Sequence, residues 1–131
     1  MDPSELKNIP LFAEVPEDKL LKVATFASLE SAVEGKTIIR EGGSANAFYA
    51  IEEGTVKVER DGKHLADLGP GDFFGEQAVL EKSERGATVT ATSPVRLIRI
   101  DHWEIPRMRK AMPEVVEELR RKAEERSRSS D

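Results

Sequence analysis

Near the middle of the chain, two glycines enclose a carboxylate and an arginine at close spacing. Gly75 is followed at once by Glu76, and Arg85 is followed by two small residues, Gly86 and Ala87. Glycine lets a ligand approach the main chain, and the start of a helical turn offers unpaired N–H groups to an anion. A guanidinium grips a phosphate with two parallel donors, whereas a carboxylate only accepts hydrogen bonds and so suits sugar hydroxyls. The segment therefore predicts a site for a sugar phosphate.

The composition limits the classes of protein to which the chain can belong. Its 131 residues are 38% hydrophobic and 34% charged, as expected for one soluble globular domain with a real core. No apolar run approaches the ~18 residues of a membrane span, and no signal peptide opens the chain. Because cysteine is absent, disulfides are excluded and a cytoplasmic location is the default expectation. The net charge of −5 argues against direct binding to nucleic acid.

The elements before this segment are predicted to be two helices. A short helix over residues 3–9 ends at Pro10, and a second begins at Pro16, with acidic residues in its first turn. Leu20, Val23, Ala24 and Ala27 then recur at helical spacing and give one buried face. Leu11 and Phe12, between the helices, are expected to fill the core.

From residue 28 to residue 100 the hydrophobic period changes to two. Short alternating runs, separated by glycine turns such as Asp61-Gly62, predict six to eight strands without long intervening helices. That pattern favours an antiparallel β-roll or jelly-roll barrel. Residues 76–80 interrupt it and are expected to form a short helical turn set into the barrel wall.

The helical period returns after residue 100. Asp101 is predicted to cap a helix that carries Trp103, Ile105, Met108, Ala111 and Met112, with the tryptophan packed in the core or between domains. A last helix from Pro113 has a narrow apolar stripe of Val115, Val116, Leu119 and Ala123. We expect an α+β domain over 1–126, with helices in 1–27, a β-roll of about eight strands in 28–100, two helices in 101–126 and a frayed tail in 127–131.

The motif Phe74-Gly75-Glu76-x-Ala78-x-Leu80, followed by Arg85-x-Ala87-Thr88-Val89, resembles the phosphate-binding cassette of cyclic nucleotide-binding domains. These domains include those of the catabolite activator protein, the regulatory subunits of cyclic AMP-dependent kinase and cyclic nucleotide-gated channels. The resemblance extends over nearly the whole chain, from Leu6 to Pro113. It implies a non-enzymatic regulatory domain of signal transduction, with the fold described above.

The resemblance also implies a role for each site residue. Glu76 would accept the ribose 2′-hydroxyl, and Arg85 would pair with the cyclic phosphate. Main-chain N–H groups would assist the phosphate, and two apolar side chains would contact the sugar and base. The N–H groups are those of Gly75, Ala78, Gly86 and Ala87, and the apolar side chains are those of Val58 and Leu65. A cyclic phosphodiester is a monoanion, so one buried guanidinium balances its charge.

Three positions depart from the usual pattern of the family. Gln77 replaces an aliphatic residue and brings an amide near the ribose. Glu84 replaces a proline and brings a carboxylate near Arg85. Gly86 lacks the hydroxyl that cyclic GMP-selective members often carry at this position, which favours cyclic AMP over cyclic GMP as the ligand.

Two other functions remain open at this point. A degenerate member that binds no nucleotide would act as a protein-docking module through Trp103 and the last helix. A metal-dependent enzyme on a similar barrel would need clustered histidines, but His64 and His102 fall on different elements, so we expect no metal and no catalysis. A sensor of this size passes its signal to a partner protein, to a second copy through the C-terminal helix or to an output domain, with no membrane contact.

Overall fold

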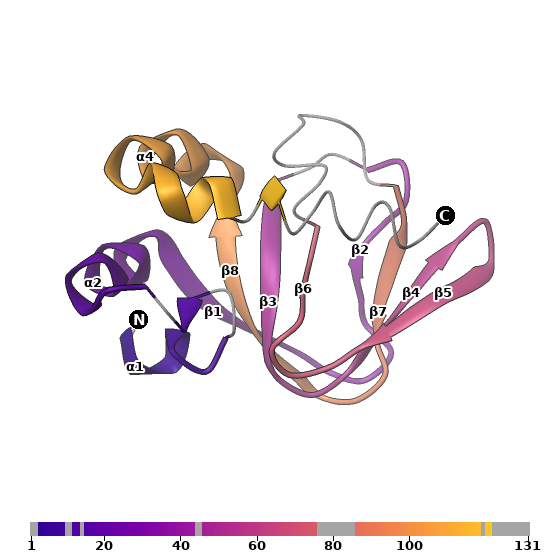
Figure 1. The fold of residues 1–131 in the computed structure, drawn as a ribbon. Helices are drawn as coiled ribbons and strands as arrows, with labels where there is room; N and C mark the ends of the chain where they lie inside the picture. The colour runs from indigo at the N-terminus through magenta and orange to yellow at the C-terminus, as the bar shows by residue number, and fades with distance from the viewer. Residues whose placement is uncertain are drawn as a thin grey trace.

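The computed structural model describes residues 3–9, 12–13, 15–43, 46–75, 86–118 and 120–121. Short helices lie on one side of two facing four-stranded sheets (Figure 1). The elements, in chain order, are α1 (Pro3–Leu6), α2 (Glu17–Phe26), β1 (Ala27–Ala32), β2 (Thr37–Ile39), β3 (Ala47–Glu53), β4 (Val56–Arg60), β5 (Lys63–Leu68), β6 (Phe73–Phe74), β7 (Thr88–Ala91), β8 (Val95–Asp101), the 3-10 turn η2 (His102–Glu104) and α4 (Ile105–Ala111). Residues 113–118 and 120–121 are also helical.

Both sheets are antiparallel. The first has the strand order β1-β8-β3-β6 and the second has the order β2-β7-β4-β5. The two sheets face each other as the walls of a roll, and the helices cover the outer face of the first sheet (Figure 1). The predicted β-roll with helices at both chain ends is therefore confirmed.

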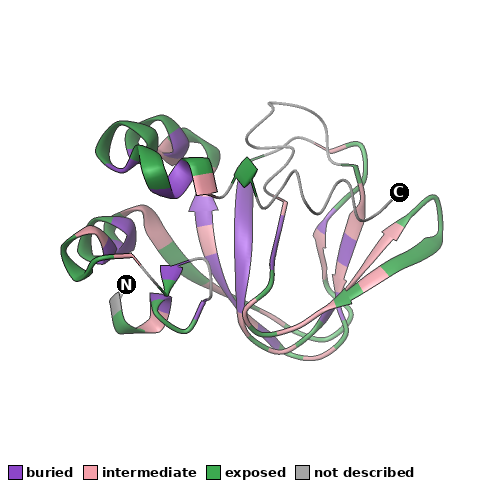
Figure 2. Cartoon of the chain, viewed as in Figure 1, coloured by how far each residue is buried: buried purple, intermediate pink, exposed green. Residues whose placement is uncertain are grey.

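Two apolar clusters hold these layers together. Figure 2 shows that buried residues run along β3 and recur along β8. The outer cluster joins both chain ends to the first sheet, because Leu20 of α2 and Val115 of the last helix pack with Ile98 and Ile100. The inner cluster lies between the sheets and contains Tyr49, Ile51, Val56, Phe74, Val89 and Leu97 among others. Alternation along β3 and β8 sends successive side chains to the two clusters.

The turn predicted at Asp61-Gly62 joins β4 to β5 as a tight hairpin. Asp61 has φ 52° and Gly62 has φ 78°. Two successive positive φ angles are typical of a type I′ hairpin turn, whose twist matches that of the strands, and Asp-Gly tolerates them well. The hairpin tip is exposed and projects from the body of the roll (Figure 2).

Four local expectations were wrong. The first helix, expected over residues 3–9, ends at Leu6. Ala27 is not on the buried face of α2 but starts β1, where it pairs with Ile100 and extends the first sheet. The Asp101 side chain does not cap the following turn, because its Oδ1 accepts a hydrogen bond from Arg99 Nε at 2.7 Å. Trp103 is 55% exposed rather than packed in a core, since it lies on η2 while Ile105 and Met108 of α4 face inward.

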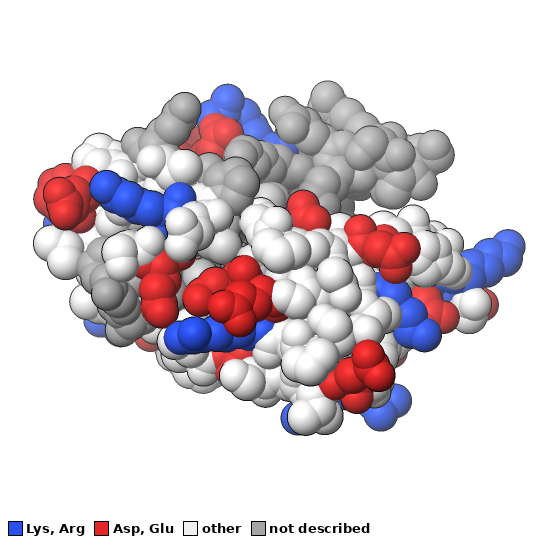
Figure 3. All heavy atoms as spheres, turned by 90° about the horizontal axis from the view of Figure 1, so that it is seen from below, with Lys and Arg blue, Asp and Glu red and all other residues white. Residues whose placement is uncertain are grey.

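Other expectations hold where the chain is described. Phe12 is buried in the outer cluster, and Val115 and Val116 of the last helix are buried there too. Leu11, Ala123, the helical turn expected over 76–80 and the tail 127–131 lie outside the described residues, and the side chain of Leu119 is likewise not described. In the described parts of the chain, no helix is both long and apolar enough to cross a membrane. Acidic and basic side chains lie next to one another on the face drawn in Figure 3.

Candidate functional site

The residues from Gly75 to Ala87 connect the two walls of the roll. Phe74, just before them, belongs to β6 and pairs with Tyr49 in the first sheet. Thr88, just after them, belongs to β7 and pairs with Glu59 in the second sheet. Gly75 has φ 82°, a left-handed conformation that glycine adopts without strain. The main chain therefore turns sharply at the position where the sequence predicts close approach of a ligand.

The structure describes only part of the predicted site. Gly75, Gly86 and Ala87 are described at the two ends of the connection, and Val58 and Leu65 are described on β4 and β5. The other predicted residues, namely Glu76, Gln77, Ala78 and Arg85, lie outside the described residues. Their roles remain predictions.

The wall of the roll beside Gly75 is aromatic. The rings of Tyr49 and Phe74 stack with centroids 5.2 Å apart and planes 21° apart. Both side chains are buried in the inner cluster, at 5% and 2% exposure. Offset stacking of this kind adds to the burial of the rings themselves. The main chain that leads into Gly75 is thus held in place by a packed ring.

The two predicted apolar contacts occupy different surroundings. Val58 is half-buried, lies opposite Val89 of β7 and packs against the inner cluster. Leu65 is 47% exposed. The β4–β5 register passes from Val58↔Ala66 to Glu59↔His64, so Leu65 is the extra residue of a β-bulge. Val58 therefore lies in the wall of the roll, whereas the Leu65 side chain is exposed and can contact a ligand.

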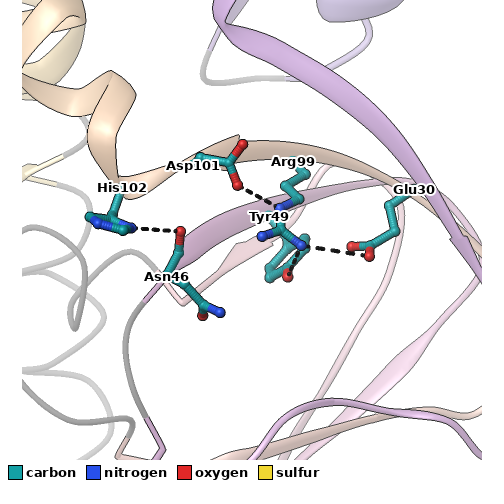
Figure 4. Close-up of polar contacts among 6 residues, drawn as sticks. All are labelled: Glu30, Asn46, Tyr49, Arg99, Asp101 and His102. Atoms are coloured by element: carbon teal, nitrogen blue, oxygen red, sulfur yellow. Dashed lines mark hydrogen bonds and ion pairs between the residues drawn. The ribbon is translucent and has the colours of Figure 1, made fainter.

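A charged cluster that the sequence analysis did not single out lies on the inner face of the first sheet (Figure 4). Arg99 of β8 donates to Asp101 Oδ1 at 2.7 Å, and its Nη1 lies 3.4 Å from Tyr49 Oη and 3.6 Å from Glu30 Oε1. The hydrogen bond to Asp101 raises the pKa of Arg99 above its usual range. Arg99 therefore braces the ring that stacks on Phe74.

The sequence did contain a signal for this cluster. Val95 and Leu97 point into the inner cluster, and Arg99 continues the same alternation on β8. A charge in an inward position of a strand needs partners, because burying an unpaired charge is costly. The partners, Glu30 and Tyr49, come from β1 and β3 and cannot be identified from local pattern.

The second end of the connection, at Gly86, is held by a side chain of the β4–β5 hairpin. Arg60 Nε donates to the Gly86 carbonyl at 2.7 Å. A Cβ built on Gly86 would meet Arg60 Nη2 at 3.7 Å, which is ordinary van der Waals contact. The backbone at Gly86 therefore accepts a side chain, and the absence of a hydroxyl there is not imposed by crowding.

A third group of charges lies where the first sheet meets α1. Arg96 Nη2 is 3.2 Å from Glu5 Oε1, and Arg96 Nε is 3.7 Å from Glu52 Oε1. Burial raises the pKa of Glu52, and Arg96 opposes that shift. These residues join the N-terminal helix to the roll, which is a structural role.

The histidines serve local contacts. His64 Nε2 lies 3.0 Å from Asp67 Oδ1, and His102 Nδ1 lies 3.1 Å from the Asn46 carbonyl oxygen. No group of three or more potential metal ligands occurs among the described residues. The described residues of the site thus supply a left-handed glycine at the start of the connection, a buried stacked ring pair in the wall and an arginine that braces this pair.

Comparison with known proteins agrees with this geometry. A family model described as "Cyclic nucleotide-binding domain" matches residues 29–111. The chain is 32% identical over 111 residues to cGMP-dependent protein kinase, isozyme 1, of Drosophila melanogaster, covering 79% of this chain and 14% of that protein. The chain thus spans about a seventh of that relative.

Two solved structures share the fold. One is the regulatory domain of Toxoplasma gondii PKA crystallised with cAMP, with TM-score 0.81, 26% identity and coverage of 94% of this chain and 48% of that one. The other is the Thermus thermophilus catabolite activator protein, with TM-score 0.84, 27% identity and coverage of 93% and 60%. The match to the family model covers more than half of the chain and includes the whole connection between the two sheets. The chain belongs to the cyclic nucleotide-binding domain family and is a regulatory domain of that kind.

Proposed function

We propose that this domain is a sensor that binds a cyclic nucleotide, preferentially cyclic AMP, between the two walls of the roll. Arg85 takes the cyclic phosphate, Glu76 takes the ribose 2′-hydroxyl, and the N–H groups of Gly75, Ala78, Gly86 and Ala87 complete the anion site. Gln77 lies beside the ribose, and Val58 and Leu65 contact the sugar and base. The domain binds its ligand without metal or catalysis.

The observation that carries the proposal is the placement of the two described ends of the connection, one at each sheet. Gly75, with φ 82°, follows a ring stacked in the wall, and Gly86 is held at the other end by Arg60. The intervening residues contain the acceptor and the guanidinium that a sugar phosphate requires. The match to the family model includes all of them.

The signal is proposed to leave through the C-terminal helices. In the structure Met108 and Val115 share the outer cluster with Leu20 of α2, and Lys19 forms an ion pair with Glu114. Helices that rest on the back of the ligand-binding wall can take a second arrangement when the ligand binds. Occupancy biases this choice only by the difference in ligand affinity between the two arrangements. The readout is a partner protein, a second copy or an output domain, in a cytoplasmic setting.

Calorimetry with cyclic AMP, cyclic GMP, a cyclic pyrimidine nucleotide and adenosine tests the site. We expect cyclic AMP to bind most tightly, and adenosine to bind far more weakly because it lacks the phosphate. Arg85→Ala should weaken cyclic AMP binding by ~2–5 kcal/mol, since it leaves the anion without its counter-charge. Arg85→Lys is the matched control, because it keeps the charge but loses the planar fork. An unchanged affinity in Arg85→Ala would remove that residue from the site.

The ribose contact has a separate test. Glu76→Ala should cost ~1–3 kcal/mol, as expected for a hydrogen bond to a charged group. The same variant should lose the preference for cyclic AMP over its 2′-deoxy analogue. Retention of the wild-type preference would show that another residue contacts the 2′-hydroxyl.

One observation favours the second candidate function, a docking module that binds no nucleotide. Trp103 is a large apolar side chain that is 55% exposed next to the C-terminal helices. A ligand at ~100 times its dissociation constant stabilises a domain by about 2.7 kcal/mol. A thermal-shift assay that finds no stabilisation by millimolar cyclic nucleotides would therefore favour docking.

A further inference from the structure

Arg60 lies one position beyond the end of a strand ladder. The pairing of β4 with β7 runs from Val56↔Ala91 to Glu59↔Thr88. The next pair in register would be Arg60 with Ala87, but the strand pairing stops at Glu59↔Thr88. Beyond that point the Arg60 side chain joins the two segments, because its Nε donates to the Gly86 carbonyl at 2.7 Å. A hydrogen bond from a guanidinium is stronger than one between neutral groups.

This contact fixes the orientation of one peptide group. The described peptide bonds include no cis bond, and in a trans peptide the C=O and the following N–H point in opposite directions. The Gly86 carbonyl points to Arg60, so the Ala87 N–H in the same plane points away from Arg60. Withdrawal of electron density at the carbonyl also makes that N–H a better donor.

Two further hydrogen bonds stabilise the arrangement. The Asp61 N–H donates to Glu41 Oε1 at 3.1 Å, and the Glu41 N–H donates to Thr88 Oγ1 at 3.1 Å. The β4–β5 hairpin, the turn after β2 and the start of β7 are therefore tied together. Arg60 is the last residue of β4, beside the Asp61-Gly62 turn, so its guanidinium lies next to the part of the hairpin that these bonds tie down.

We propose that Arg60 is a positioning residue for the anion: by holding the Gly86 carbonyl it aims the Ala87 N–H at the bound phosphate. This inference rests on the proposed function, because the Ala87 N–H is one of the donors of that site. Arg60 itself does not touch the ligand. Its effect is on the direction and strength of a main-chain donor.

A matched pair of variants separates this role from a general effect of charge. Arg60 and Lys63 are cross-strand partners on the same exposed hairpin, so Arg60→Gln and Lys63→Gln remove the same charge from the same place. We expect about tenfold weaker cyclic AMP binding in Arg60→Gln, the effect of losing one well-directed hydrogen bond, and less than twofold in Lys63→Gln. The loss should persist at high salt, whereas a screened surface charge would lose its effect.

A spectroscopic readout reports the peptide group itself. In the wild type, cyclic AMP should move the Ala87 amide proton downfield in a ¹⁵N-resolved NMR titration, and Arg60→Gln should reduce that shift while Lys63→Gln retains it. Urea unfolding of the ligand-free proteins is the control for folding, and we expect similar midpoints because both side chains are exposed. Arg60→Met is a second substitution at the same position that should give the same loss of affinity.

The outcomes distinguish the two proposals. If the wild type binds none of the cyclic nucleotides, the proposed function is overturned and this inference with it. If the wild type binds cyclic AMP but Arg60→Gln and Lys63→Gln bind it equally well, the inference alone is overturned. The inference alone is also overturned if the affinity loss of Arg60→Gln disappears at high salt, or if Arg60→Gln shows the same Ala87 amide shift as the wild type.

Discussion

Gly54, in the turn between β3 and β4, offers a quantitative test of how the roll is closed. Its φ is +91°, and a Cβ added there would lie 2.3 Å from the Pro94 carbonyl oxygen, 2.7 Å from Val95 Cγ1 and 2.9 Å from Val95 Cα. Two of these three atoms are backbone atoms, one in the turn between β7 and β8 and one in the first residue of β8. Because backbone atoms cannot move aside as a flexible side chain can, Gly54→Ala forces the two turns apart.

The expected cost has two parts. A left-handed conformation costs a residue with a Cβ roughly 1–2 kcal/mol, and overpacking costs typically 1–3 kcal/mol. We therefore expect Gly54→Ala to lower the free energy of unfolding by about 3 kcal/mol. That is a large share of the ~5–15 kcal/mol typical of a domain.

Urea unfolding measures this loss, with Gly62→Ala as the matched control. Gly62 has φ +78°, but nothing lies within 4 Å of an added Cβ, so only the conformational part applies. We expect the midpoint to fall in both variants, by the larger amount in Gly54→Ala, with an unchanged slope. Equal losses in the two variants would refute the claim that contact between the turns adds to the cost.

Two further predictions concern charged residues of the first sheet. Glu52 is 12% exposed and its Oε2 has no hydrogen-bond partner among the described residues, so burial raises its pKa. A carboxyl whose pKa is raised by folding destabilises the fold as pH rises through that value, so Glu52→Gln should raise the free energy of unfolding by roughly 1 kcal/mol at pH 7. Urea unfolding at pH 7 and pH 4 checks this, and a gain of the same size at pH 4, where the carboxyl is protonated, would contradict it. Arg99→Met leaves Glu30 and Asp101 without their shared cation and should cost about 1–2 kcal/mol, whereas Tyr49→Phe removes one weak hydrogen bond and should cost less than about 1 kcal/mol. Thermal unfolding in which Tyr49→Phe is the more damaging change would show that Arg99 is not the centre of this cluster.

Much of the architecture could be predicted from local pattern. The change of hydrophobic period near residues 28 and 100 separates helices from strands, and Asp61-Gly62 predicts a hairpin turn. Such patterns are readable because each depends on neighbours within a few residues. The boundaries between helix and strand at Ala27 and Asp101 were harder to predict, since both residues belong to strands through their pairing with distant residues.

The candidate site, too, has a part that the sequence predicts and a part that it does not. Gly75, Glu76, Arg85, Gly86 and Ala87 are close in sequence, so their residue types and spacing predict a phosphate site without a structure. The residues that brace this segment are not close in sequence. Tyr49 reaches Phe74 across the β3–β6 pair, and Arg60 reaches Gly86 over a separation of 26 residues.

The sequence by itself therefore determined the family, the strand and helix content and the chemistry of the segment from Gly75 to Ala87. Only the tertiary structure decided that this segment leaves one sheet and enters the other, and that Arg99 and Arg60 support its two ends. The physical reason is that period and motif are properties of adjacent residues. Side-chain partnership across sheets depends on strand order and register, which no single stretch of the chain contains.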